Sequence, residues 1–375
     1  MKKRILLTLL LLFLFILILK LNHQGKVISD LSDLVDDKST TQLITAPAQQ
    51  LQVAPVPVPP TFYIAYITNG GQDSVNLIKY DGTVTNLAPL DTINSNTVYD
   101  QFIDVDLDRD NSNNPYALYL RRFGNPPFQW ELRLKQFFSP TLEILPPPNG
   151  VLPGQSRVFL DVEGPNNDKY VVVSTNRGLD FTHKGSSGTW DPWTSISGSS
   201  PLGLRVDSLG NAYILAYGIN DIHLITIDPS GSFGTTFIDT NIANFGTMSG
   251  GIILEPDIAI TGNFYHIVYS KAIHYGTYIS AEYYYVNNLA GSISLPVLFM
   301  SYTIPVTPGT LSGTFYMRNR AVALPGFNTI IDVFSMKNDI GSTPIINELK
   351  ATVLAGILPS FLVSNSPFIA NYKTA

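Results

Sequence analysis

The chain has 375 residues, of which 45% are hydrophobic and 14% are charged, and its formal net charge is −6. This composition is too apolar for a disordered protein, and an acidic chain with no Lys/Arg cluster beyond its N-terminus is not expected to bind nucleic acid. Cysteine is absent, which excludes disulfides, thiol nucleophiles and metal sites with cysteine ligands.

The first 21 residues predict an export signal. Residues 2–4 are Lys-Lys-Arg, and residues 5–19 are apolar except for Thr8. A basic start followed by an apolar stretch of this length is typical of a signal peptide, or of a signal anchor where it is not cleaved. If it is retained, residues 5–21 bind the membrane and the basic flank keeps the N-terminus cytoplasmic. We therefore expect an exported protein that is either secreted or anchored in the cell envelope and facing outward.

Residues 22–60 are predicted to form a linker. This part is polar, has no strand or helix period, and ends in the Pro-rich sequence VAPVPVPP at residues 53–60. Such a sequence favours the extended polyproline II conformation, which suits a stalk that holds a folded domain away from a membrane. The alternative is a disordered tail that remains after signal cleavage.

A repeated unit begins at residue 61. Its first marker is a tyrosine in a short apolar run, as in YIAYIT and YHIVYS. The shared tyrosines are Tyr63, Tyr116, Tyr170, Tyr213 and Tyr265, roughly 50 residues apart, and residues 327–335 are a degraded sixth copy. The second marker is a glycine before another short apolar run, at Gly82, Gly188, Gly231 and Gly291.

The two markers together describe four short strands joined by turns, which is the unit of a β-propeller blade. We therefore predict an all-β fold, a β-propeller over residues 61–375 with six blades of four antiparallel strands, and seven blades as the alternative. Residues 361–372 either supply a strand that closes the first blade or begin a seventh. A β-sandwich does not repeat a four-strand unit, and the strands are too short for a large membrane barrel.

The first strand of five blades carries a charged residue at the same place in an apolar run. The residues at this place are Asp104, Asp161, Arg205, Asp257 and Arg320. First strands line the channel of a propeller, and a charge within an apolar strand is costly unless it is paired or hydrated. The pattern therefore predicts a polar ring around a water-filled channel. Two interpretations stay open: Asp–Arg pairs that only stabilise the fold, or a ring that contacts a ligand.

Residues 106–114, with the sequence DLDRDNSNN, have alternating carboxylates that resemble a calcium-binding loop. Calcium prefers several oxygen ligands that converge on one ion, so Asp106, Asp108 and Asp110 are the expected ligands. The match to an EF-hand loop is incomplete, because Asn111 replaces the usual glycine and Ala117 the bidentate glutamate. The alternative is an acidic turn that is simply solvated.

Trp190, in the sequence SGTWDPW, is a further candidate for ligand binding, together with Trp193. Either ring would stack on the face of a sugar or pack between two blades. The five histidines lack the spacing of a helical zinc site, and no nucleophile elbow, Walker A loop or dinucleotide fingerprint occurs in a fitting context. No catalytic residue is therefore assigned from a motif.

Residues 174–196, STNRGLDFTHKGSSGTWDPWTSI, resemble the strand–turn–Trp portion of sialidase-like, BNR-repeat propellers, and residues 256–270 resemble a blade opening of that group. The resemblance implies a propeller and, for an active sialidase, an arginine triad, a Tyr–Glu nucleophile pair and an aspartic acid/base. Arg205 and Arg320 match two of the arginines. The Asp-box pattern S-x-D-x-G-x-x-W is not intact, and only Gly188 and Trp190 correspond to it.

Two functional hypotheses follow from these patterns. The first is an exported, envelope-tethered propeller that acts as a binding module, for a glycan or for a surface protein. The second is a sialidase-like, glycan-processing enzyme with its site at the mouth of the channel. In that case Asp104, Asp161 or Asp257 would supply acid/base chemistry beside the two arginines of the ring.

Overall fold

The computed structural model describes residues 62–68, 73–81, 83–93, 99–112, 114–154, 156–163, 166–185, 187–218, 221–240, 243–244, 251–262, 264–289, 291–305, 314–323, 329–338, 347–355 and 362–363. Within these ranges the secondary structure is all-β, with no helix. Consistent with that, none of the described residues lies in a helix long and apolar enough to cross a membrane. The predicted signal segment and linker lie outside the described residues.

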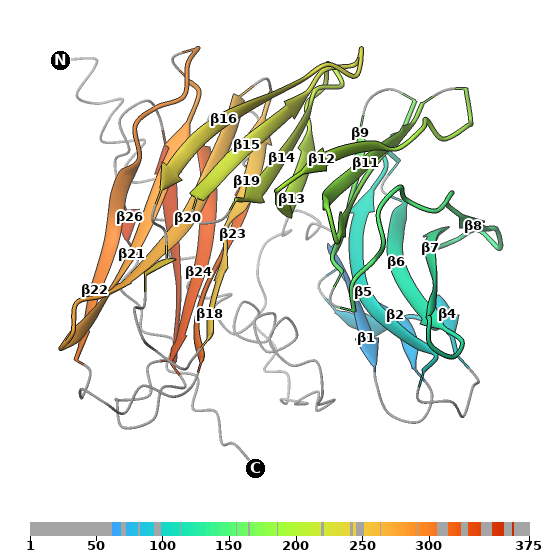
Figure 1. The fold of residues 1–375 in the computed structure, drawn as a ribbon, viewed down its shortest axis with the longest axis horizontal. Coiled ribbons are helices and arrows are strands. Elements are labelled where there is room, and N and C mark those ends of the chain that lie inside the picture. The colour runs from blue at the N-terminus through green and yellow to red at the C-terminus, as the bar shows by residue number, and fades with distance from the viewer. Residues whose placement is uncertain are drawn as a thin grey trace, which may run out of the picture. The chain divides into compact units, whose positions relative to one another are not determined.

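The described strands form six sheets, which follow the chain in order except that β18 belongs to the last one (Figure 1). The first four are β1 (Phe62–Thr68), β2 (Ser74–Tyr80), β3 (Val84–Asn86) and β4 (Asp91–Thr92); β5 (Gln101–Arg109), β6 (Pro115–Phe123), β7 (Gln129–Gln136) and β8 (Leu142–Ile144); β9 (Val158–Glu163), β10 (Asp168–Thr175), β11 (Gly178–Lys184) and β12 (Thr194–Ser197); and β13 (Ser200–Val206), β14 (Ala212–Tyr217), β15 (Asp221–Ile227) and β16 (Phe233–Thr240).

The last two sheets have a fifth strand each. One contains β19 (Asp257–Thr261), β20 (Phe264–His274), β21 (Tyr278–Asn287) and β22 (Val297–Pro305), and β17 (Ala243–Asn244) pairs with β20 in parallel. The other contains β23 (Thr314–Ala323), β24 (Thr329–Asn338), β25 (Asn347–Ala355) and β26 (Leu362–Val363), and β18 (Gly251–Glu255) pairs with β23 in parallel. All other strand pairs of these two sheets are antiparallel.

The predicted four-strand unit is confirmed by this topology. The repeated tyrosine lies in the second strand of its sheet in β6, β10 and β14, and β20 and the strand of the degraded copy, β24, are second strands when the parallel strands β17 and β18 are set aside. In the first sheet the tyrosine, Tyr63, lies on the first strand, β1. Gly188, Gly231 and Gly291 lie between the third and fourth strands with positive φ angles of 74°, 84° and 82°, a conformation that favours glycine in a tight turn. The fold is therefore built from propeller-type blades, and the number of blades stays a prediction.

One expectation about the C-terminus is corrected by the pairing of the strands. In the segment 361–372, Leu362 and Val363 form β26, which pairs with β25 as the outer strand of the last sheet. They therefore do not extend the first sheet, in which β1 carries Tyr63 and pairs with β2. Residues 364–372 lie outside the described residues.

The described residues fall into two compact units. The N-terminal unit holds residues 62–219 and 223–236, and the C-terminal unit holds residues 221–222 and 237–363. The prediction of one domain over residues 61–375 stays a prediction.

In the N-terminal unit the hydrophobic core lies in layers between neighbouring sheets. One layer joins the sheet β5–β8 to the sheet β9–β12 through Leu118, Leu120, Leu160 and Val173, all at most 1% exposed. Similar layers join the sheet of β1–β4 to β5–β8, and the sheet of β9–β12 to β13–β16. Each fully buried aliphatic side chain of this size contributes about 1.5–3 kcal/mol, so packing of sheet on sheet supplies most of the stability.

Candidate functional site

Asp104 of the predicted polar ring is one of three carboxylates on β5 that bind the backbone of β9, and the other two, Asp106 and Asp108, were expected as calcium ligands. Asp104, Asp106 and Asp108 alternate along the strand, so their side chains leave it on the same side. Their Oδ2 atoms accept hydrogen bonds from the backbone N–H groups of Val158 at 2.9 Å, Leu160 at 2.8 Å and Val162 at 2.6 Å. The three bonds form a ladder between the first strands of two neighbouring sheets.

The ladder supplies hydrogen-bond acceptors to the open edge of β9. Strand β9 pairs with β10 along one edge only, so the N–H groups of its other edge need acceptors. Side-chain carboxylates from the adjacent sheet supply those acceptors, and hydrogen bonds to a charged acceptor are stronger than neutral ones. The acidic residues of β5 therefore hold two sheets together by closing an open strand edge.

Two other residues of the predicted ring make the same contact. Asp161 on β9 accepts a hydrogen bond from the backbone N–H of Val206 on β13 at 3.2 Å. In the C-terminal unit, Asp257 on β19 accepts one from the backbone N–H of Ala321 on β23 at 3.0 Å. The structural interpretation expected arginine side chains as partners, whereas the bonds seen for these carboxylates go to backbone amides of the next first strand.

The two arginines of the ring are placed on first strands, as expected. Arg205 lies on β13, where its Nη1 donates to the carbonyl oxygen of Leu204 at 2.8 Å. Its charge also lowers the pKa of Asp108 and of Asp161, so it lies in the field of both. Arg320 lies on β23 in register with Val333. The two arginines belong to different units of the chain.

The carboxyl groups of Asp108 and Asp161 both have a raised pKa. Burial raises the pKa of Asp108 from 3.8 to about 6, against the lowering effect of the Val162 N–H and of the Arg205 charge. Burial, and then the charge of Asp108, raise the pKa of Asp161 well above its ordinary value. The two carboxyl groups therefore influence each other's pKa, and burial is the main cause of both shifts.

The acidic loop that suggested calcium is divided between a strand and a turn. Asp106 and Asp108 are strand residues engaged in the ladder, whereas Asp110 organises the turn to β6. Its Oδ1 accepts from the backbone N–H groups of Ser112 at 2.9 Å and Asn114 at 2.8 Å. Within the part of the chain that the structure describes, no three His, Asp or Glu side chains are grouped as metal ligands. Calcium at this loop stays a prediction.

The same turn recurs between β13 and β14. There the Oδ1 of Asp207 accepts from the backbone N–H groups of Leu209 and Asn211, both at 2.9 Å. An aspartate that accepts from residues two and four positions later is a local turn motif. The acidic residue at the start of each turn therefore fixes the conformation of the turn. Spaced carboxylates in a sequence are compatible with such a turn and also with a metal-binding loop, so the sequence alone does not distinguish the two.

Trp190 binds strand β8, and Trp193 binds the chain that follows it. The indole N–H of Trp190 donates to Oε1 of Glu143 at 2.7 Å, and Lys184 forms an ion pair with the same oxygen. The indole N–H of Trp193 donates to the carbonyl oxygen of Pro146 at 3.1 Å. Both rings pack against the layer between the second and third sheets, which agrees with the packing interpretation of these tryptophans.

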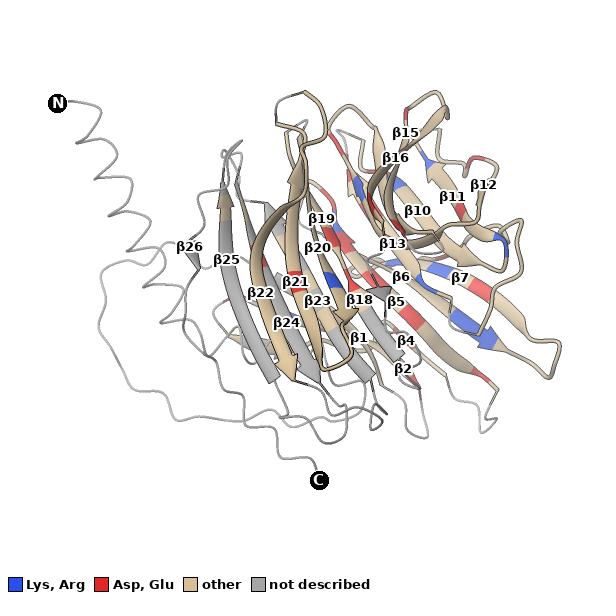
Figure 2. Cartoon of the chain, turned by 60° about the vertical axis from the view of Figure 1, so that its left-hand side comes forward, with Lys and Arg blue, Asp and Glu red and all other residues tan. Residues whose placement is uncertain are grey.

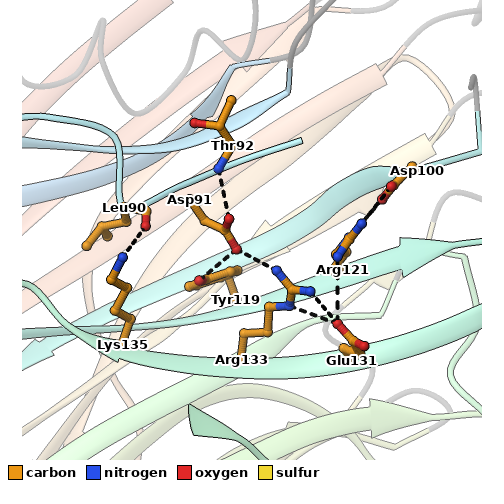
Figure 3. A network of polar contacts seen from close by, with 9 residues as sticks. All are labelled: Leu90, Asp91, Thr92, Asp100, Tyr119, Arg121, Glu131, Arg133 and Lys135. Atoms are coloured by element: carbon orange, nitrogen blue, oxygen red, sulfur yellow. Dashed lines mark hydrogen bonds and ion pairs between the residues drawn. The ribbon is translucent and has the colours of Figure 1, made fainter. Parts of the chain in front are cut away.

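A charged network that sequence reasoning missed joins the first sheet to the second (Figure 3). Asp91 on β4 accepts from the Tyr119 hydroxyl at 3.0 Å and from Arg133 at 2.7 Å, and Arg133 also contacts Glu131. Burial, and then the charge of Asp91, raise the pKa of Tyr119, so its hydroxyl stays a donor. Beside them Arg121 forms a two-pronged ion pair with Asp100, at 2.8 and 2.7 Å.

The basic residues of this network stand out as bands on β6 and β7 in Figure 2. The arginines of the two paired strands are visible in the sequence, but Asp91 belongs to a strand of only two residues. No local pattern links that aspartate to residues of β7 about 40 positions later. The network is therefore a product of how the sheets pack.

In the C-terminal unit, His266 is fully buried on β20 and has a structural role. It lies 2.7 Å from the hydroxyl oxygens of Thr261 and Tyr285, one at each ring nitrogen. Burial lowers its pKa to about 4. A neutral ring with one donor and one acceptor nitrogen satisfies both hydroxyls, which explains a histidine within an apolar strand.

Comparisons with known proteins give solved structures only. No family model and no curated protein matches the chain. Similar structures include a triple mutant of AofleA from Arthrobotrys oligospora, with 10% identity, a TM-score of 0.43, and coverage of 82% of this chain and 87% of that one. An α-L-arabinanase from Cellvibrio cellulosa has 9% identity, a TM-score of 0.36, and coverage of 69% and 94%.

A mutant of the NanB sialidase from Streptococcus pneumoniae is also similar, with 10% identity and a TM-score of 0.35. The match covers 82% of this chain and 60% of the sialidase, so the chain spans well under two thirds of that enzyme. All three TM-scores lie below 0.5, so these similarities do not indicate a function.

Proposed function

We propose that this protein is an exported, envelope-tethered propeller that acts as a binding module for glycans. The observation that supports it most is the ladder of carboxylates on the first strands. Asp104, Asp161 and Asp257 each hold a backbone amide of the neighbouring first strand, so these acidic residues act as a scaffold. A rigid scaffold that leaves its loops free to vary is well suited to ligand binding.

Export and tethering rest on the N-terminal sequence. A basic start, an apolar stretch at residues 5–19 and a Pro-rich stretch at residues 53–60 suit a signal or anchor followed by a stalk. The binding surface would then face away from the cell. Protease protection of the intact chain in sealed vesicles tests this: cleavage of the repeat region from the outside supports it, and protection of that region overturns it.

The binding function is tested with a glycan array probed by the full-length chain in mild detergent, with and without calcium. Bound sugars are then examined by mass spectrometry. Selective retention of intact sugars is the expected result. A blank array under both metal conditions would overturn glycan binding and would favour a protein ligand instead. Retention that requires calcium and is lost in Asp110→Asn would support the predicted metal loop.

A second candidate function is glycoside hydrolysis, and the pair Asp108 and Asp161 favours it. Both carboxyl groups have a raised pKa and both feel the charge of Arg205, and a hydrolase of this kind would use two such carboxyl groups as its acid and base. The same mass analysis separates the two functions, because an enzyme releases shortened sugars. Hydrolysis should then be lost in Asp161→Asn with the ladder bond retained, since an amide oxygen also accepts an N–H.

A further inference from the structure

Three neighbouring side chains lie at the end of the sheet β5–β8 that is next to the β6–β7 turn. Gln101 lies opposite Arg122, and Arg122 lies opposite Trp130, on three adjacent antiparallel strands. Residues directly opposite each other project from the same face of a sheet, so the three side chains are neighbours. The hairpin turn that follows, residues 124–127, is exposed.

Arg122 carries a charge that no described residue neutralises. Its Nη2 donates to Oε1 of Gln101 at 2.6 Å, an uncharged acceptor, and its buried Nε has no hydrogen-bond partner among the described residues. The adjacent Arg121, by contrast, is paired with Asp100 at 2.7 Å. The undescribed stretch before Tyr99, residues 94–98, is Asn-Ser-Asn-Thr-Val and contains no acidic residue. A partly buried guanidinium without a counter-ion is unfavourable, and an anion from outside would relieve the cost.

One aromatic ring lies against the same guanidinium, and a second ring lies against the first. The ring of Phe128 lies 4.6 Å from the Arg122 Cζ atom, and the ring of Tyr99 lies 5.8 Å from Phe128 with a tilt of 40°. Tyr99 is 42% exposed, so it presents part of its ring to solvent. The guanidinium can pair with a carboxylate or sulfate, while the neighbouring pair of aromatic rings offers an apolar surface.

Sugars with an acidic group combine these two features, because the ring has an apolar face and carries an anion. We propose that Arg122, Gln101, Phe128 and Tyr99 form a rim site for an oligosaccharide with a carboxylate or sulfate group. This inference rests on the proposed glycan-binding function and names the ligand class and the site. The net charge of −6 would weaken the binding of densely charged polyanions, which favours a short oligosaccharide over nucleic acid.

The test is calorimetric titration of the full-length chain in mild detergent with three probes. These are tetragalacturonate, its fully methyl-esterified form, and a sulfated chondroitin tetrasaccharide. We expect binding of at least one acidic probe and at least tenfold weaker binding of the neutral ester, because a charge-assisted hydrogen bond is lost. The two acidic probes distinguish a carboxylate from a sulfate as the preferred anion.

Variants test whether the acidic probes bind at the rim site. Arg122→Gln should weaken binding of the acidic probe at least tenfold, and Tyr99→Ala should weaken binding of all probes that bind. Lys169→Gln is the matched control, because Lys169 lies 5.0 Å over the ring of Tyr116 at the other end of β6. If Arg122→Gln does not fold, as judged by circular dichroism, Phe128→Leu replaces it, since it keeps apolar bulk but removes the ring face.

The outcomes separate this inference from the proposed function. Acidic probes that bind Arg122→Gln as well as the wild type would overturn the rim site and leave glycan binding intact. The same holds if the array retains only neutral sugars and no acidic probe binds. A blank array together with blank titrations would overturn both. Loss of binding in Arg122→Gln but not in Lys169→Gln supports both.

Discussion

Replacing Asp108 by asparagine should stabilise the protein at high pH and have little effect at low pH. Burial raises the pKa of this carboxyl from 3.8 to about 6, so the folded chain keeps a proton that the unfolded chain releases. The stability from this proton is fully present below pH 3.8 and is lost as pH rises through about 6. Above that, the wild type has an ionised carboxylate in a partly buried position.

The size of the effect follows from the change in pKa. A rise of about 2 in pKa corresponds to about 3 kcal/mol, and the partial exposure of the side chain reduces this. We therefore expect Asp108→Asn to be more stable than the wild type by about 1–3 kcal/mol at pH 8. The hydrogen bond to Val162 is kept, because the amide oxygen of asparagine accepts the same N–H. At pH 4 the two proteins should differ by a few tenths of a kcal/mol.

The assay is urea unfolding of both proteins between pH 4 and pH 8, followed by tryptophan fluorescence. Asp228→Asn serves as a control of opposite sign, because hydrogen bonds from Ser230 lower the pKa of Asp228. That variant should be less stable than the wild type at pH 8, and the difference should disappear as pH falls. A stability difference for Asp108→Asn that stays constant with pH, or that favours the wild type at pH 8, would refute the reasoning.

Three further predictions concern packing and burial. Arg133→Gln should cost about 3 kcal/mol in urea unfolding, because it leaves two partly buried carboxylates without their shared partner; an unchanged midpoint would contradict this. Gly178→Ala should cost at least about 2 kcal/mol, since φ is +141° and a Cβ would lie 2.2 Å from the Ile196 carbonyl oxygen, whereas Gly154→Ala, with open space around it, should be neutral in the same thermal melt. The wild type should lose stability as pH falls from 6.5 to about 4, because only a neutral His266 ring fits the buried site, and His266→Gln should not show this pH dependence. Identical pH profiles of the two proteins would count against it.

The sequence alone was sufficient to predict the repeated four-strand sheets. Strand and turn preferences are local, so the repeated tyrosine and the glycine before the fourth strand located sheets that the structure contains. The charged place in the first strand was also visible, because Asp104, Asp161 and Asp257 each interrupt an apolar run. A polar residue in such a run must find a partner, and that requirement could be stated before any partner was known.

The identity of the partners was decided only by the tertiary structure. Asp104 binds Val158, 54 residues later, and Asp257 binds Ala321, 64 residues later, through backbone amides that every residue type except proline carries. A backbone donor leaves no trace in the sequence, so residue types alone pointed to arginine side chains as the partners. The unpaired charge of Arg122 was hidden for a related reason. Arg121 and Arg122 are adjacent and chemically identical, and only the placement of Asp100 and Gln101 by the neighbouring strand determines which of the two is neutralised.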